Sequence, residues 1–223
     1  MAEPSQANEQ RIHLATPLSL RTSFAFPLQS RLARREVLIG AALLLLPGVG
    51  WLLNMGHRIM MVHRMQHGEP AWPSWRAPGE LLRHGLVTLL GMLYWHAPGA
   101  LVIALGARLE STGTMAAGGL LFACGTVAVP GYMTHYCRDF AVREVFSPVL
   151  AVRRIRGAGG AYWRAWAIAA SALILSFAGL AGFGVFFLVT SVWFWQVAGF
   201  SFASVFTQTY ELHAPYSRTS GSR

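Results

Sequence analysis

The most constraining feature of this chain is an apolar run near its C-terminus, from Ala165 to Thr209, that contains no charged residue. The run is more than forty residues long, and three closely spaced glycines, Gly179, Gly182 and Gly184, interrupt it. One helix crosses the hydrocarbon core of a bilayer in about 20 residues. The run therefore predicts two membrane spans joined by a tight glycine turn.

Five apolar stretches in all are long enough and free enough of charge to be membrane segments. They cover residues 37–56, 86–107, 112–136, 165–180 and 183–209. The chain is 54% hydrophobic and 12% charged, whereas about a quarter of the residues in soluble domains are charged. We therefore expect an all-α, polytopic transmembrane helical bundle. Its membrane domain covers residues 31–213, between a flexible cytoplasmic tail at residues 1–30 and a flexible tail at residues 214–223.

The first apolar stretch carries Pro47, Gly48 and Gly50 near its middle, where a helix is easily interrupted. A re-entrant hairpin and a fifth, kinked span are both compatible with this pattern. All 18 basic residues are arginines, and cytoplasmic loops hold the excess of positive charge. With a hairpin, every arginine except Arg108 lies on the cytoplasmic side, as do both termini, so we prefer the hairpin.

The segment His57–His67 predicts a basic amphipathic helix at the membrane surface, with arginine and histidines on one side and methionines on the other. Arg58 is an exception, because it falls on the methionine side. His63 and His67 are four residues apart, so they could share a metal such as copper. The simpler interpretation is a surface helix without metal.

Two further features suit the membrane surface. Trp72 and Trp75, in a linker rich in proline, are expected to be interfacial anchors. A second basic segment, Arg138–Arg156, predicts another surface helix. The cluster expected to bind the phosphates of anionic lipids consists of Arg153, Arg154, Arg156 and Arg164. These charges flank the spans, so we expect no nucleic-acid partner despite a pI near 10.7.

The linker between the first two apolar stretches resembles the signature of a prokaryotic integral membrane family known as domain of unknown function 4013. The residues that carry the resemblance are Asn54-Met55-Gly56-His57-Arg58, Arg64, His67-Gly68-Glu69-Pro70, Pro73-Ser74-Trp75, Leu81 to Gly85, Pro98 and Tyr210. One departure is His57, where an aromatic residue such as tyrosine is expected. The resemblance covers residues 35–212 and implies a multi-pass protein of the prokaryotic inner membrane. It implies no activity, cofactor or catalytic residue.

Polar groups inside the apolar stretches are the candidates for chemistry, because they are costly in hydrocarbon. None of the five stretches contains Glu, Asp or Arg. His96 and His135 remain, and a neutral imidazole could ligate a tetrapyrrole metal. A hydrogen bond to a neighbouring helix is the favoured interpretation. The last stretch also offers Gln196 among its aromatic residues, as part of a polar strip that could line a path for a solute.

Small residues four apart predict close helix packing, within the chain or against a partner. The pairs are Gly119 with Ala123, Ala178 with Gly182, and Gly199 with Ala203. Cys124 and Cys137 lie too far apart along one helix to form a disulfide.

Composition excludes several enzyme classes. The chain has no lysine, so it can form neither a Walker P-loop nor a Schiff base. It also lacks the G-x-S-x-G, C-x-x-C and G-x-G-x-x-G motifs. We expect a non-enzymatic structural or accessory component of a membrane complex, or a lipid-organising protein. Its partners would be bound lipid and a protein partner or second copy. The alternatives are a small-solute transporter or channel, suggested by the Pro–Gly pairs, and a tetrapyrrole-binding subunit.

Overall fold

The computed structural model of the protein describes residues 18–181 and 184–211. Within these ranges every regular element is helical, and four helices are long and apolar enough to cross a membrane. This confirms the predicted all-α polytopic bundle. The predicted tails at residues 1–17 and 214–223 lie outside the described residues. In chain order the elements are α2 (Leu20–Ala25), η1 (Phe26–Leu28), α3 (Arg31–Leu43), α4 (Val49–Gln66), α5 (Pro78–Arg108), α6 (Thr112–Asp139), η2 (Val142–Glu144), α7 (Pro148–Phe177), η3 (Ala178–Ala181) and α8 (Val185–Glu211).

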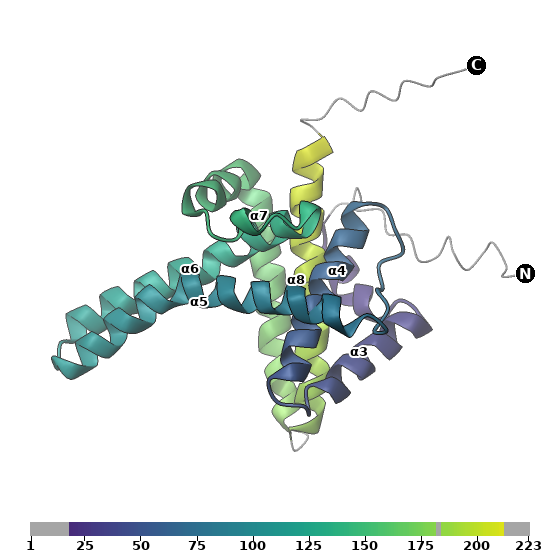
Figure 1. Cartoon of the computed structure of the whole chain (residues 1–223), viewed down its shortest axis with the longest axis horizontal. Helices are drawn as coiled ribbons and strands as arrows, with labels where there is room; N and C mark the ends of the chain where they lie inside the picture. Colours follow the sequence, from purple (N-terminus) through teal and green to yellow (C-terminus); the bar gives the residue numbers. More distant parts are fainter. Residues whose placement is uncertain (1–17, 182–183, 212–223) are drawn as a thin grey trace, which may run out of the picture.

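The four long apolar helices form two hairpins that cross each other (Figure 1). Helices α5 and α6 pack together and project far to one side of the molecule. Helices α7 and α8 pack together across the base of the first hairpin. Since two crossed hairpins cannot both lie along the normal of one flat bilayer, at least one is strongly tilted in a membrane. The crossing also creates a junction where helices from both hairpins meet α4.

The first apolar stretch reverses direction between α3 and α4. Helix α3 ends at Leu43 and α4 begins at Val49, after Gly48 with a φ of 76° that favours glycine. The Asn54 side chain of α4 donates a hydrogen bond of 3.0 Å to the carbonyl of Gly40 in α3. The stretch therefore turns back at its Pro–Gly pair, as the hairpin hypothesis requires, and does not form one continuous fifth span.

Helix α4 is the central element of the fold, and this corrects an expectation from the sequence. It packs against α5, α6 and α8, and Met61 is completely buried. His57, on its basic side, is only 3% exposed. The prediction of a helix at the membrane surface is wrong for this segment, because other helices cover both its apolar side and part of its polar side.

Residues 18–30 also differ from expectation, since they are folded into the core. The Phe26 ring is 2% exposed and stacks on Trp72 and Phe200, with centroids 5.2 and 4.7 Å away. The indole N–H of Trp193 donates to the carbonyl of Phe24 at 3.3 Å. The predicted flexible tail is therefore wrong for residues 18–30, because their aromatic side chains fill a gap beside α8.

Helix α7 has two arms that meet at Gly159, whose φ of 54° and ψ of −134° are not helical. The first arm carries Arg153, Arg154 and Arg156, and the second arm forms the apolar hairpin with α8. Helix breaks at the other Pro–Gly pairs are not observed. Helices α5 and α6 continue through Pro98 and Pro130. The Pro–Gly pairs of α5 and α6 thus give less support to a transporter than the sequence suggested.

Candidate functional site

Arg58 lies where α4 meets α8. Its guanidinium carbon is 4.4 Å from the centre of the Trp195 ring, in a cation–π arrangement. Its stem passes Gly199 of α8, where an added Cβ would lie 3.5 Å from Arg58 Cγ and 3.3 Å from the terminal methyl of Met61. The backbone of α8 at Gly199 therefore lies in close contact with the Arg58 stem and the Met61 side chain of α4.

Two cavities share Arg58 and Trp195 as lining residues. The larger, of about 500 Å³, lies between the α3–α4 turn and α8. The smaller, of about 310 Å³, lies at the hairpin crossing and is lined from α4, α5, α6, α7 and α8. Both volumes fall in the range of ligand sites, about 300–1,000 Å³.

The charge of Arg58 has no carboxylate partner at this site. Neither cavity is lined by Asp or Glu, and the ion pairs among the described residues involve other groups. Burial lowers the pKa of Arg58, yet a guanidinium titrates so far above neutral pH that it stays protonated. Placing a cation against apolar walls costs free energy of desolvation, and contact with an aromatic ring face offsets only about 2 kcal/mol of that cost. The arrangement is therefore suited to an anion.

Two further buried polar atoms lack a hydrogen-bond partner and belong to cavity-lining residues. The indole nitrogen of Trp166 belongs to the wall of the smaller cavity, and the side-chain oxygen of Gln196 to that of the larger. Gln196 is 4% exposed. The indole N–H of Trp166 can donate to a ligand, whereas the side-chain oxygen of Gln196 can only accept from one.

A buried acid and imidazole lie beside this site. Glu36 and His57 are 6% and 3% exposed, and their Oε2 and Nε2 atoms are 3.1 Å apart. Trp75 donates its indole N–H to the same oxygen of Glu36 and stacks on His57 with centroids 3.9 Å apart. These contacts hold Glu36 at His57 and Trp75, so its charge is not available to Arg58.

The expected metal pair, His63 and His67, lies side by side with ring centroids 4.2 Å apart. Each Nδ1 lies 2.8 Å from a carbonyl oxygen, that of Cys137 for His63 and that of His63 for His67. A carbonyl partner makes Nδ1 the donor and leaves Nε2 for a ligand. Over residues 18–181 and 184–211 no third His, Cys, Asp or Glu completes a metal group. Metal binding here stays a prediction.

The two expected cofactor histidines are not brought to one cavity. His96 contacts the Met92 carbonyl through Nδ1 at 2.8 Å and the Thr126 hydroxyl through Nε2 at 3.1 Å. It lines the smaller cavity, whereas His135 is not among the lining residues. His135 is 6% exposed and packs edge-on against Phe206. These contacts favour a structural role for His96, in which it links α5 to α6 by hydrogen bonds, over ligation of a tetrapyrrole metal.

The expected phosphate-binding arginines divide into two kinds. Arg153, Arg156 and Arg164 are exposed on α7. Arg154 instead forms a largely buried ion pair with Glu144. The expectation for Arg154 is therefore corrected, because Glu144 already binds its guanidinium.

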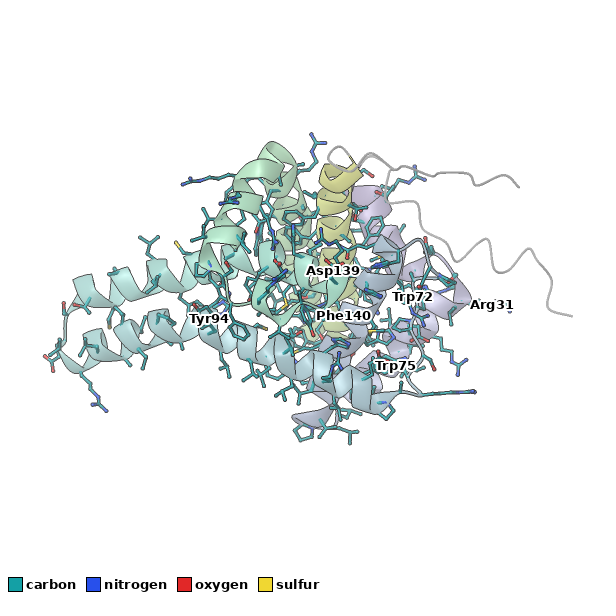
Figure 2. All side chains as sticks on the ribbon, turned by 45° about the horizontal axis from the view of Figure 1, so that its top comes forward. Arg31, Trp72, Trp75, Tyr94, Asp139 and Phe140 are labelled. Carbon is teal, nitrogen blue, oxygen red and sulfur yellow. The ribbon has the colours of Figure 1, made fainter. Side chains whose placement is uncertain are left out.

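The linker tryptophans are not the interfacial anchors that the sequence predicts. Trp72 is 7% exposed, and its carbonyl accepts a hydrogen bond from Arg64 at 3.1 Å. Trp75 has its indole nitrogen bonded to Glu36. Figure 2 shows both at the end of the molecule opposite the projecting tip of α5 and α6. Trp72 stacks on Phe26 and Trp75 is bonded to Glu36, so both residues are part of the packing.

Of the predicted small-residue pairs, only Gly199 and Ala203 lie in a helix contact of the described chain. Gly119 and Ala123 are exposed, because the face of α6 that packs on α5 is one residue away, at Gly118. Ala178 is exposed too, and Gly182 lies outside the described residues. Contact with a partner helix stays a prediction for the pair on α6 and for Ala178 with Gly182.

Sequence reasoning missed Arg58 as a site residue, although a signal was present. An arginine on the methionine side of an amphipathic helix breaks the pattern of that helix. Such a break is expected where the arginine meets a specific partner. Gln196, by contrast, was identified from the sequence and lies in the wall of the larger cavity.

Comparison with known proteins gave no match: no family model, no curated protein and no solved structure is similar to this chain. The resemblance to domain of unknown function 4013 therefore stays a prediction.

Proposed function

We propose that this chain is a non-enzymatic integral membrane protein that organises lipid or serves as an accessory component of a membrane complex, in the inner membrane of a prokaryote. The observation that carries the proposal is the pair of cavities that share Arg58, one at the hairpin crossing and one between the α3–α4 turn and α8, with mostly apolar walls and one arginine. Apolar walls suit acyl chains, and a guanidinium suits an oxyanion. Both features belong to a lipid.

Mild-detergent extraction from native membranes tests the proposal. Native mass spectrometry of the extracted full-length protein should show a stoichiometric lipid or a protein partner. A bare protein, with neither lipid nor partner at the lowest detergent concentration that keeps it soluble, would contradict the proposal.

A transporter or channel for a small solute is the second candidate. It is favoured by one observation, namely that Arg58 and Trp195 line both cavities and so lie between them. Solute flux into liposomes that changes when Trp195 is replaced by alanine would support transport. An absorption band in the extracted protein, lost on replacing His96, would instead support the tetrapyrrole alternative.

A further inference from the structure

We propose that Arg58 binds the anionic headgroup of an amphiphile whose acyl chain occupies the adjoining cavities. This inference rests on the proposed function and narrows it to a ligand class. The shared chemistry is an oxyanion, either the carboxylate of a fatty acid or the phosphate of a phospholipid, attached to an apolar chain.

The charge of the cavity walls favours an anionic ligand. The walls of both cavities contain Arg58 and no carboxylate. The buried acid Glu36, which lines neither cavity, is held by His57 and Trp75. A guanidinium presents several N–H donors in a planar fork that matches a carboxylate or phosphate. An oxyanion is thus the partner that this cation lacks within the described chain.

A second donor supports the same site. The Trp166 indole nitrogen is buried close to the Tyr162 hydroxyl, in a residue that lines the same cavity as Arg58. Indole N–H is a donor only. Across Arg58, the amide of Gln196 lines the larger cavity. The donors at this site therefore come from α4 and α7, whereas the unpartnered side-chain oxygen of Gln196 on α8 is an acceptor and does not bind an anion.

The walls select an amphiphile over a free inorganic anion. Leu188 and Val192 line the larger cavity, and Val62, Leu173 and Phe202 line the smaller. An inorganic phosphate would leave these apolar surfaces without contact. An acyl chain would cover them, and hydrophobic burial would add to the affinity.

Quenching of tryptophan fluorescence by brominated amphiphiles tests the inference on the full chain in detergent. The probes are dibromostearate, brominated phosphatidylglycerol, and two uncharged controls, dibromostearyl alcohol and brominated phosphatidylcholine. We expect at least one anionic probe to bind about 10-fold or more tightly than its uncharged control. The anionic probe with the larger preference identifies the source of the headgroup.

Arg58→Gln should abolish this preference, and Arg108→Gln, which removes an exposed arginine outside both cavities, should retain it. Trp166→Phe should weaken the preference several-fold while leaving Arg58 in place, so it gives an answer even if Arg58→Gln does not fold. Equal binding of charged and uncharged probes by the wild type would overturn the inference, as would an unchanged preference in folded Arg58→Gln. A stoichiometric lipid that co-purifies with Arg58→Gln and wild type alike would overturn the inference but leave the proposed function standing.

Discussion

The guanidinium of Arg58 lies 4.4 Å from the centre of the Trp195 ring, and both residues line the cavity at the hairpin crossing and the cavity beside the α3–α4 turn. This pair links α4, from the α3–α4 hairpin, to α8, from the C-terminal hairpin. The contact thus joins two segments far apart in sequence at the site where we place a ligand headgroup.

Replacing Trp195 by leucine should destabilise the protein, because the arginine loses the ring face that offsets part of its burial. We expect a loss of about 1–2 kcal/mol, measured by thermal unfolding in detergent. Trp195→Phe retains an aromatic face and should lose less. Equal stability of Trp195→Leu and wild type would show that the cation–π contact contributes nothing.

Gly56 is expected to tolerate no side chain. An added Cβ at Gly56 would collide with the Leu81 carbonyl oxygen, where α4 and α5 pack backbone to backbone. Gly56→Ala should therefore cost about 2–3 kcal/mol through overpacking. Gly119→Ala is the matched control, since no neighbouring atom lies within 4 Å of a Cβ there. If both variants unfold at the same temperature, the close contact of α4 with α5 is absent.

Glu36 and His57 should behave as a coupled pair. Glu36→Gln leaves the buried His57 without its carboxylate, and we expect a loss of about 3 kcal/mol. In a double-mutant cycle with His57→Gln, chemical unfolding should give a coupling energy of about 1 kcal/mol or more. Additive effects would contradict the pairing of Glu36 with His57. Glu110→Gln, at an exposed position, should change stability little.

Gly159→Ala should oppose the break in α7. A φ of 54° with a ψ of −134° is a conformation that essentially only glycine adopts, so the substitution should cost about 1–3 kcal/mol or straighten the helix. Spin labels on the two arms, at positions 153 and 164, would report a changed distance if the helix straightens. Gly157→Ala, in the helical first arm and open to space, should be neutral or stabilising. Unchanged stability together with an unchanged distance would contradict the break.

The arginines of α7 should separate into two groups. Replacing Arg153, Arg156 and Arg164 together by glutamine should reduce the enrichment of phosphatidylglycerol around the protein in mixed vesicles, at about 1 kcal/mol per arginine. Quenching of the exposed Trp163 by brominated phosphatidylglycerol would measure this enrichment. Arg154→Gln should leave that enrichment nearly unchanged but lower stability by about 2 kcal/mol, because Glu144 then keeps only the exposed Arg143, 4.0 Å away. A larger lipid effect from Arg154→Gln than from the triple variant would reverse this assignment.

The sequence by itself determined the helical membrane class and the positions of the long helices. Hydropathy depends on each residue in turn, and a helix must be about 20 residues long to cross a bilayer, so both can be read along the chain. The glycine turn before α8 and the reversal at Pro47 were predicted for the same local reason. The tertiary structure then placed these helices in two crossed hairpins.

Only the tertiary structure decided what covers each apolar face. The pattern of residues 57–67 shows that one side of a helix is apolar, but lipid and neighbouring helices satisfy such a side equally well. Because of the same ambiguity, the sequence pattern predicted that Trp72 and Trp75 lie at the membrane surface and that residues 18–30 form a tail. Arg58 became a candidate site residue only when Trp195 and the two cavities were found beside it. The contacts that join α4 to α8 span distant parts of the chain, and no local pattern records them.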